Sequence, residues 1–193
     1  MNALTEMITQ QLAGSAMSRI SGKIGADHGT TSKAVALAIP LLISALARNS
    51  STPAGAQALN QAVANDHDGS ILDNLMGFLG NSGSADGAGI LGHILGDRRS
   101  DVETGLAQST GLEPSAAGQL LETVAPLVMG ALGKTQQQQG LDASGLSDFL
   151  GSQHQQAQNT APDLMGMLSG FLDSNKDGSV MDDVSRIAGK FFG

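Results

Sequence analysis

VALAIPLLISALAR, residues 35–48, and LETVAPLVMGALGK, residues 121–134, lie 86 positions apart in this chain. Each is an apolar run with helical spacing, and each has a proline at the same place, Pro40 in the first and Pro126 in the second. A proline inside a helix costs about 3 kcal/mol or more and normally kinks it. Two prolines at matching places therefore predict one helical unit that the chain uses twice.

Glycine recurs with the same separation, because Gly25 and Gly111 stand before the two runs. We expect matching kinked helices over residues 31–48 and 114–134, each within a similar local unit. The alternative is a chance similarity between two helices rich in Ala and Leu. The neighbours of the two helices in space decide between these interpretations.

The composition predicts an all-α fold, a multi-helix bundle of short helices punctuated by glycine. Hydrophobic residues make up 40% of the 193 residues, but Trp and Tyr are absent and Phe occurs only five times. A core of small aliphatic side chains suits closely packed helices better than an aromatic-rich sheet. The 26 glycines oppose long helices, because each glycine inside a helix costs about 0.5–1 kcal/mol relative to Ala.

Changes in composition divide the chain into two similar helical halves and a C-terminal helical segment. NSGSADGAG is the clearest linker, and SQHQQAQNTAP is a second polar connection. The predicted division is residues 1–80 for the first half, 81–89 for the linker, 90–151 for the second half, 152–162 for the polar linker and 163–193 for C-terminal helices with an Asp-rich turn.

Two helix starts can be read directly from residue pairs. Thr52 precedes Pro53, and proline at the first helical position loses no N–H that the helix needs. Ser70 is followed three residues later by Asp73, in the manner of a capping box.

Charge and apolar run length limit the partners and the compartment. The formal net charge of −8 argues against nucleic acid and anionic membranes, which attract clustered Lys and Arg. The chain has no Cys, which fits a reducing cytoplasm, and its N-terminus has no secretory signal. The longest apolar run, residues 34–47, is shorter than the roughly 20 residues of a spanning helix, so we expect no transmembrane segment.

FLDSNKDGSVMDDV, residues 171–184, begins like the calcium loop of an EF-hand, with Gly178 at the sixth loop position. Its second half departs from that pattern, because Met181 and Val184 occupy the ninth and twelfth positions. The closing carboxylate must then come from a shifted position, and the site should be weak. The predicted calcium ligands are Asp173, Asn175, Asp177, Ser179 through its carbonyl, and Asp183.

The same stretch has a second interpretation as a polar turn and a helix start. Ser179 and Asp182 form a capping pair, and Asp near a helix N-terminus is favoured by the helix dipole. DHDGSILDNL, residues 66–75, repeats the same core with Ala64 where the first ligand would stand. Both interpretations stay open on the sequence alone.

No set of residues predicts catalysis or a bound cofactor. The four histidines are scattered, although His67 lies between two Asp residues, where a metal or a solvated loop is the alternative. His93 lies in the apolar stretch ILGHILG. The chain has neither G-x-S-x-G nor a phosphate-binding Gly-Lys-Ser/Thr loop.

Three longer stretches resemble a known family: GAGILGHILGDRR at 87–99, GLAQSTGLEPSAAGQLLETVAPLVMGALGK at 105–134 and DGSVMDDVSRIAGKFF at 177–192. With their glycine pattern they are similar to the bacterial YidB-like family, whose members are mostly described as domains of unknown function. The resemblance implies an all-helical bacterial domain with an Asp-rich loop near its C-terminus. It implies no reaction, substrate or catalytic residue.

The leading functional hypothesis is a non-enzymatic helical module that assembles with itself, as a homo-oligomer, or with another protein. Plentiful Ala, Gly and Met favour close and adaptable helix contacts. The alternative is a weak calcium-responsive binding protein that uses residues 173–183. An enzyme of unknown class is the third possibility.

Overall fold

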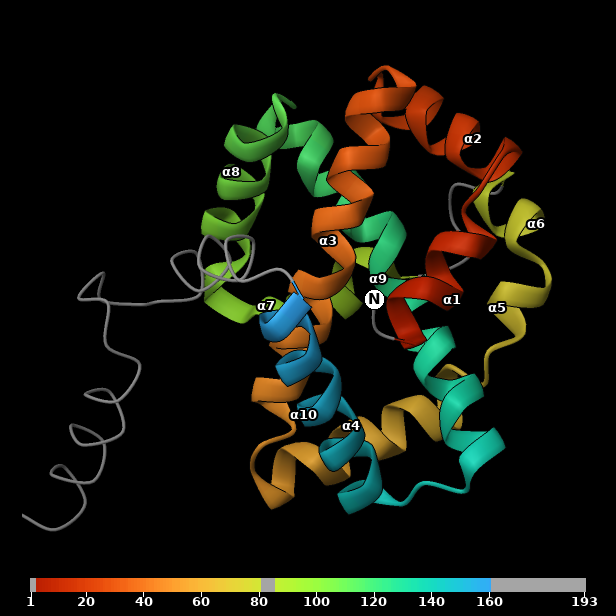
Figure 1. Ribbon diagram of the computed structural model, residues 1–193, viewed down its shortest axis with the longest axis vertical. Helices are drawn as coiled ribbons and strands as arrows, with labels where there is room; N and C mark the ends of the chain where they lie inside the picture. The colour runs from red at the N-terminus through yellow and green to blue at the C-terminus, as the bar shows by residue number, and fades with distance from the viewer. Residues whose placement is uncertain (1–2, 81–85, 161–193) are drawn as a thin grey trace, which may run out of the picture.

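The computed structural model describes residues 3–80 and 86–160, and it is all-α over these residues (Figure 1). The Asp-rich turn and the rest of the C-terminal segment 163–193 lie outside the described residues. The helices of the first part are α1 Ala3–Gln11, α2 Ser15–Ile24, α3 His28–Asn49, α4 Pro53–Asp66, α5 Ser70–Asp73 and α6 Leu75–Gly80. Those of the second part are α7 Gly87–Leu95, the 3-10 turn η1 Gly96–Arg98, α8 Arg99–Thr110, α9 Pro114–Gln139 and α10 Ala143–Thr160.

Helices α3 and α9 confirm the predicted pair of helices at 31–48 and 114–134. Helices α1–α4 correspond in order to α7–α10. The ends of α2 and α8 show the repeat in detail, because both stop at a glycine in the left-handed conformation. The Gly25 N–H donates to the Ser21 carbonyl, and the Gly111 N–H donates to the Ala107 carbonyl. Donor and acceptor are both shifted by 86 residues, so the same cap directs the chain into α3 and into α9.

The neighbours of α3 and α9 also match. The two helices pack against each other at the centre, with α7 and α8 on one side and α1, α2, α5 and α6 on the other (Figure 1). Each half covers the central helix of the other, because α10 packs on α3 while α4 packs on α9. Helices α4 and α10 then contact each other. This exchange supports duplication over chance similarity.

Both central helices contain their proline, and each is largely buried. Pro126 cannot donate to the Glu122 carbonyl one turn earlier, and Gly87 at the start of α7 lies directly against that carbonyl. A Cβ on Gly87 would overlap the carbonyl oxygen. The proline and the glycine together therefore fix where α7 crosses α9.

Two helices are long and apolar enough to span a membrane by length and composition, namely α3 and α9. Of the most apolar 18-residue window of each, 67% is buried inside the fold in α3 and 89% in α9. The finding is weak evidence for a membrane span, because a buried core helix passes the same test.

Parts of both predicted linkers are helical. Residues 152–160 of the predicted polar linker 152–162 continue α10, and Gln153 of this stretch is buried. The predicted linker 81–89 gives way to α7 at Gly87. The glutamine run after Lys134 extends α9. Glutamine and alanine are good helix formers, and packing on α3 and α4 stabilises the polar end of α10.

Candidate binding groove

Two adjoining hollows, of about 990 Å³ and about 530 Å³, lie beside the middle of α9. They are bounded by α3, α4, the turn into α5, α5, α6, α7 and α9, and we call them together the α9 groove. The residues that line both hollows are Ala62, His67, Ile90 and His93. Because these residues are shared, the two hollows lie next to each other.

The turn between α4 and α5 forms one wall of the groove. Helix α4 ends where the His67 N–H donates to the Val63 carbonyl, and Gly69 then adopts a φ of 93°. The Asp68 carboxylate accepts a hydrogen bond of 2.9 Å from the Ser70 N–H, and hydrogen bonds from Ser70 lower the pKa of Asp68. Asp68 therefore holds the start of α5. The predicted helix start at Ser70 is confirmed, but the predicted side-chain capping is wrong, since the N-cap position of α5 makes no side-chain hydrogen bond and the Asp73 carboxylate accepts from Lys134 instead.

Two glycines of α9 let this turn approach closely. A Cβ on Gly130 would overlap a methyl group of Ile71, and a Cβ on Gly133 would overlap the His67 carbonyl oxygen. Glycine inside a helix costs about 0.5–1 kcal/mol relative to Ala, so its use here reflects the close approach. Lys134, the next residue along, donates to the Asp73 carboxylate at 2.8 Å and ties α9 to α5.

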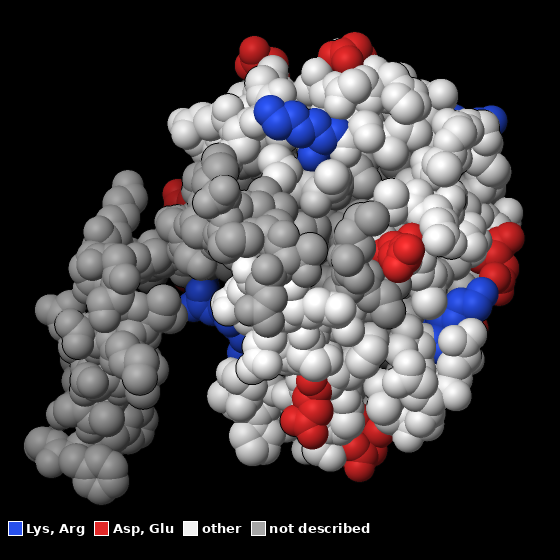
Figure 2. Space-filling model, viewed as in Figure 1, with Lys and Arg blue, Asp and Glu red and all other residues white. Residues whose placement is uncertain are grey.

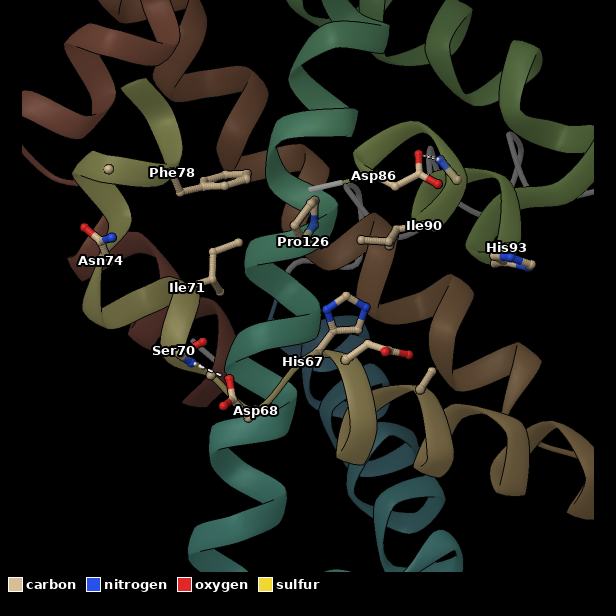
Figure 3. Close-up of a pocket in the computed structure, with 15 residues that line it drawn as sticks. His67, Asp68, Ser70, Ile71, Asn74, Phe78, Asp86, Ile90, His93 and Pro126 are labelled. Carbon is tan, nitrogen blue, oxygen red and sulfur yellow. Dashed lines mark hydrogen bonds between the residues drawn. The ribbon is translucent and has the colours of Figure 1, made fainter. Parts of the chain in front are cut away.

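The floor of the groove is apolar. Ile71 and Phe78 from one wall and Ile90 from the other point toward Pro126 on α9 (Figure 3). All three are partly buried side chains packed against the core. The lining of the second hollow includes four buried apolar side chains, which are Leu46, Leu59, Ile94 and Met129.

The rim of the larger hollow is acidic. Asp66, Asp68 and Asp86 lie along it, and no Lys or Arg is among the described residues that line either hollow. The Asp86 carboxylate accepts from the Gly89 N–H at 2.8 Å and so caps α7 (Figure 3). On the face shown in Figure 2, Asp and Glu side chains are interspersed with Lys and Arg over the described residues. The three carboxylates make the rim attractive to cations.

His67 lies in the centre of the groove, whereas His93 is exposed at its edge (Figure 3). Burial lowers the pKa of His67, and the nearby Asp66 opposes that effect. The imidazole is therefore neutral near pH 7 and presents a largely apolar ring to the groove. Among the described residues, no three His, Asp or Glu side chains converge as a metal site, so Asp66, His67 and Asp68 are not gathered around one point.

A second polar cluster, which the sequence did not reveal, joins α3 to α10. The fully buried Ser44 hydroxyl donates to the Pro40 carbonyl at 2.8 Å, so its oxygen is left to accept from His154 Nδ1 at 2.9 Å. His154 Nε2 then accepts from the Gln158 side-chain amide at 2.8 Å. Burial and the positive charge of Arg48 lower the pKa of His154. Because the Ser44 hydroxyl donates to Pro40 within α3 and accepts from His154 of α10, it links these two helices.

The predicted calcium ligands Asp173, Asn175, Asp177, Ser179 and Asp183 lie outside the described residues. The calcium site therefore stays a prediction. The groove residues were not predicted as a set, because His67, Phe78 and Ile90 come from three separate elements. The one available signal was the pair Gly130 and Gly133, whose spacing inside a helix indicates a close neighbour.

Comparison with known proteins gives a family and no activity. No curated protein and no solved structure matches the chain. The family described as "Bacterial protein of unknown function (DUF937)" matches residues 6–136, which include α2–α8 and most of α9. The YidB-like resemblance is consistent with this match. The chain belongs to the bacterial family DUF937, whose function is unknown.

Proposed function

We propose that this chain is a non-enzymatic helical interaction module whose α9 groove binds an amphipathic, basic helix of a protein. The observation that supports the proposal is the combination of an apolar floor with an acidic rim. Ile71, Phe78 and Ile90 offer apolar contact area, and three carboxylates stand beside them. An amphipathic helix places apolar anchors at i, i+3, i+4 and i+7 and carries its charges on the flank.

The size of the groove favours a peptide over a small molecule. Small-molecule pockets measure about 300–1,000 Å³. The larger hollow alone, at about 990 Å³, is at the top of this range, and the second adds about 530 Å³. Several side chains of one helix face fill such a depression better than a single metabolite does.

Charge supports a basic occupant. The rim carboxylates of Asp66, Asp68 and Asp86 face no Lys or Arg among the described lining residues. The Asp66 carboxylate also has no salt bridge to Lys or Arg within the part of the chain that the structure describes. A Lys or Arg on the partner would therefore gain charge complementarity, which accelerates association and selects against acidic partners.

The test uses the full chain and a fluorescent synthetic peptide of Leu and Lys arranged as an amphipathic helix. We expect saturable binding by fluorescence anisotropy, and a peptide of the same composition with its apolar face scrambled should bind about tenfold more weakly or not at all. Ile90→Glu should weaken binding by about tenfold or more, because it places a charge on the floor.

Leu37→Glu is the matched control for that variant. Leu37 is also a partly buried aliphatic residue of a helix, on α3 and outside the groove. Its substitution should change affinity by less than about twofold. Equal losses in both variants, or no binding of either peptide to any form of the chain, would contradict the proposal.

A further inference from the structure

We propose that the α9 groove is occupied in cis by this chain's own residues 184–192, VSRIAGKFF, which an external partner must displace. This inference rests on the proposed function and names the occupant. It makes the module self-blocked, so that binding is controlled by competition. The evidence is the match between the groove and the chemistry of this short stretch.

The stretch has the spacing of an amphipathic helix. Val184, Ile187 and Phe191 stand at i, i+3 and i+7, which places them on one helical face. Arg186 and Lys190 are four residues apart and therefore share one flank. This is the pattern of apolar anchors with adjacent basic residues that an apolar floor with an acidic rim accepts.

Phe, Lys and Arg are scarce in the chain. Two of its five Phe and two of its ten Lys and Arg fall within residues 184–192. The groove floor around Ile90 is an apolar surface bordered by Asp66, Asp68 and Asp86, with no Lys or Arg among the described residues that line it. Burial of a Phe side chain away from water is favourable, so the stretch gains from this site. Its basic residues gain from Asp66 and Asp86.

The connecting length permits docking in cis. Helix α10 ends at Thr160, and Val184 follows 24 residues later. At up to about 3.3 Å per residue, 24 residues reach about 80 Å. A compact domain of this size has a radius of gyration of only about 15 Å. The stretch can therefore reach any face of the domain.

The same tether favours the chain's own segment over that of a second copy. Covalent attachment through a connection of this length gives an effective concentration in the millimolar range. At micromolar protein, a segment from a second molecule competes at about a thousandfold disadvantage. Self-occupation should therefore not depend on protein concentration.

The experiment compares full-length wild type with Phe191→Ser, using the isoleucine methyl signals of Ile71 and Ile90. Loss of the Phe191 ring should shift both groove signals, because the ring leaves their surroundings. Phe171→Ser is the control, since it removes another Phe of the C-terminal region outside 184–192, and it should leave both signals in place. Signals that are identical in Phe191→Ser and wild type would overturn the inference.

Peptide affinity separates the two proposals. Phe191→Ser should bind the Leu and Lys peptide about tenfold more tightly than wild type does, because the competing segment is weakened. Equal affinity of wild type and Phe191→Ser overturns self-occupation and leaves the groove as a binding site. No binding by either chain overturns the proposed function itself. Methyl shifts that appear only on concentrating the protein, together with dimer-sized particles, overturn docking in cis.

Discussion

Helices α3 and α9 are counterparts, yet their corresponding faces are covered in different ways. On α3, Ser44 bonds His154 of α10, which lies along the helix and continues to Thr160. On α9, the counterpart 86 residues later is Gly130, which admits the Ile71 side chain. The Ser44 hydroxyl therefore holds α10 against α3. The absence of a side chain at Gly130 allows the turn between α4 and α5 to approach α9.

The helices that cover α3 and α9 differ as well. Helix α4 has 14 residues and makes a limited contact with α9, whereas α10 has 18 residues and packs extensively on α3. Beyond Asp66 the first half turns away into α5 and α6, and the groove lies between this turn and α7. The two copies of the unit thus share a core built on α3 and α9, and only the surface beside α9 has become a candidate binding site.

The largest expected effect on stability comes from a substitution that prevents the turn between α4 and α5 from approaching α9 closely. Gly133→Ala would drive a methyl group into the His67 backbone carbonyl, and backbone cannot move aside cheaply. We expect a loss of about 3 kcal/mol in the free energy of unfolding, measured with urea, despite the better helix propensity of Ala. Gly92→Ala on α7, where a Cβ meets nothing within 4 Å, should instead stabilise by about 0.5–1 kcal/mol. Equal changes in the free energy of unfolding for the two variants would contradict the proposal that glycine is needed on α9 for the close approach of the turn.

The hydrogen-bond bridge on the α3 side should have a smaller effect. Ser44→Ala leaves the half-buried His154 Nδ1–H without its acceptor, which should destabilise the fold by about 1–2 kcal/mol. Ser32→Ala, on the exposed face of the same helix, should change stability by less than about 0.5 kcal/mol. If urea unfolding gives the same midpoint for both variants, α10 is held by apolar packing alone.

Both sides contain a histidine whose titration opposes folding. The pKa values of His67 and His154 are lowered from 6.5 by burial, so the folded protein binds fewer protons than the unfolded chain does. Stability is therefore fully present above pH 6.5 and is lost as pH falls through the lowered pKa values. Urea unfolding from about pH 7.5 to about pH 5 should show this decline.

Variants assign that decline to its two sources. His67→Gln and His154→Gln should each flatten part of the pH dependence. The carboxylates with lowered pKa values, such as Asp27 and Asp142, titrate below their ordinary 3.8 and do not contribute in this window. A decline that survives removal of both buried histidines would contradict the assignment.

The smallest expected effect concerns the C-terminal loop, which belongs to neither half. If Asp173, Asn175, Asp177, Ser179 and Asp183 hold calcium, the lack of a bidentate Glu should limit the dissociation constant to about 10⁻⁴–10⁻³ M. Calorimetry at millimolar calcium should then give heat with the native chain and much less with Asp177→Ala. Equal or absent heat would leave Ser179 and Asp182 as a helix cap.

The repeated helices and several of their caps could be predicted from sequence because their signals are local. Pro40 and Pro126 marked α3 and α9, and Thr52 before Pro53 marked α4, where the Thr52 hydroxyl accepts from the Gly55 N–H at 3.1 Å. These signals act within one or two helical turns, so no tertiary information is needed.

The missed features depend on tertiary packing. The polar stretch 152–160 looked like a linker, because the partner that makes it a helix is Ser44, more than 100 residues away in the chain. The groove likewise forms only when Phe78 and Ile90 meet on opposite sides of Pro126. Composition cannot place such residues together, although Gly130 and Gly133 indicated that something packs closely on α9.

The central claim is that binding takes place in the α9 groove and leaves the core outside the groove unchanged. A methyl-resolved titration of the full chain with the amphipathic Leu and Lys peptide tests it most directly. The account predicts shifts at Ile71 and Ile90, which line the groove, and none at Ile20 and Ile39, which are fully buried outside it. Shifts confined to Ile20 and Ile39, or no shift at Ile71 and Ile90 when the peptide binds, would contradict the claim.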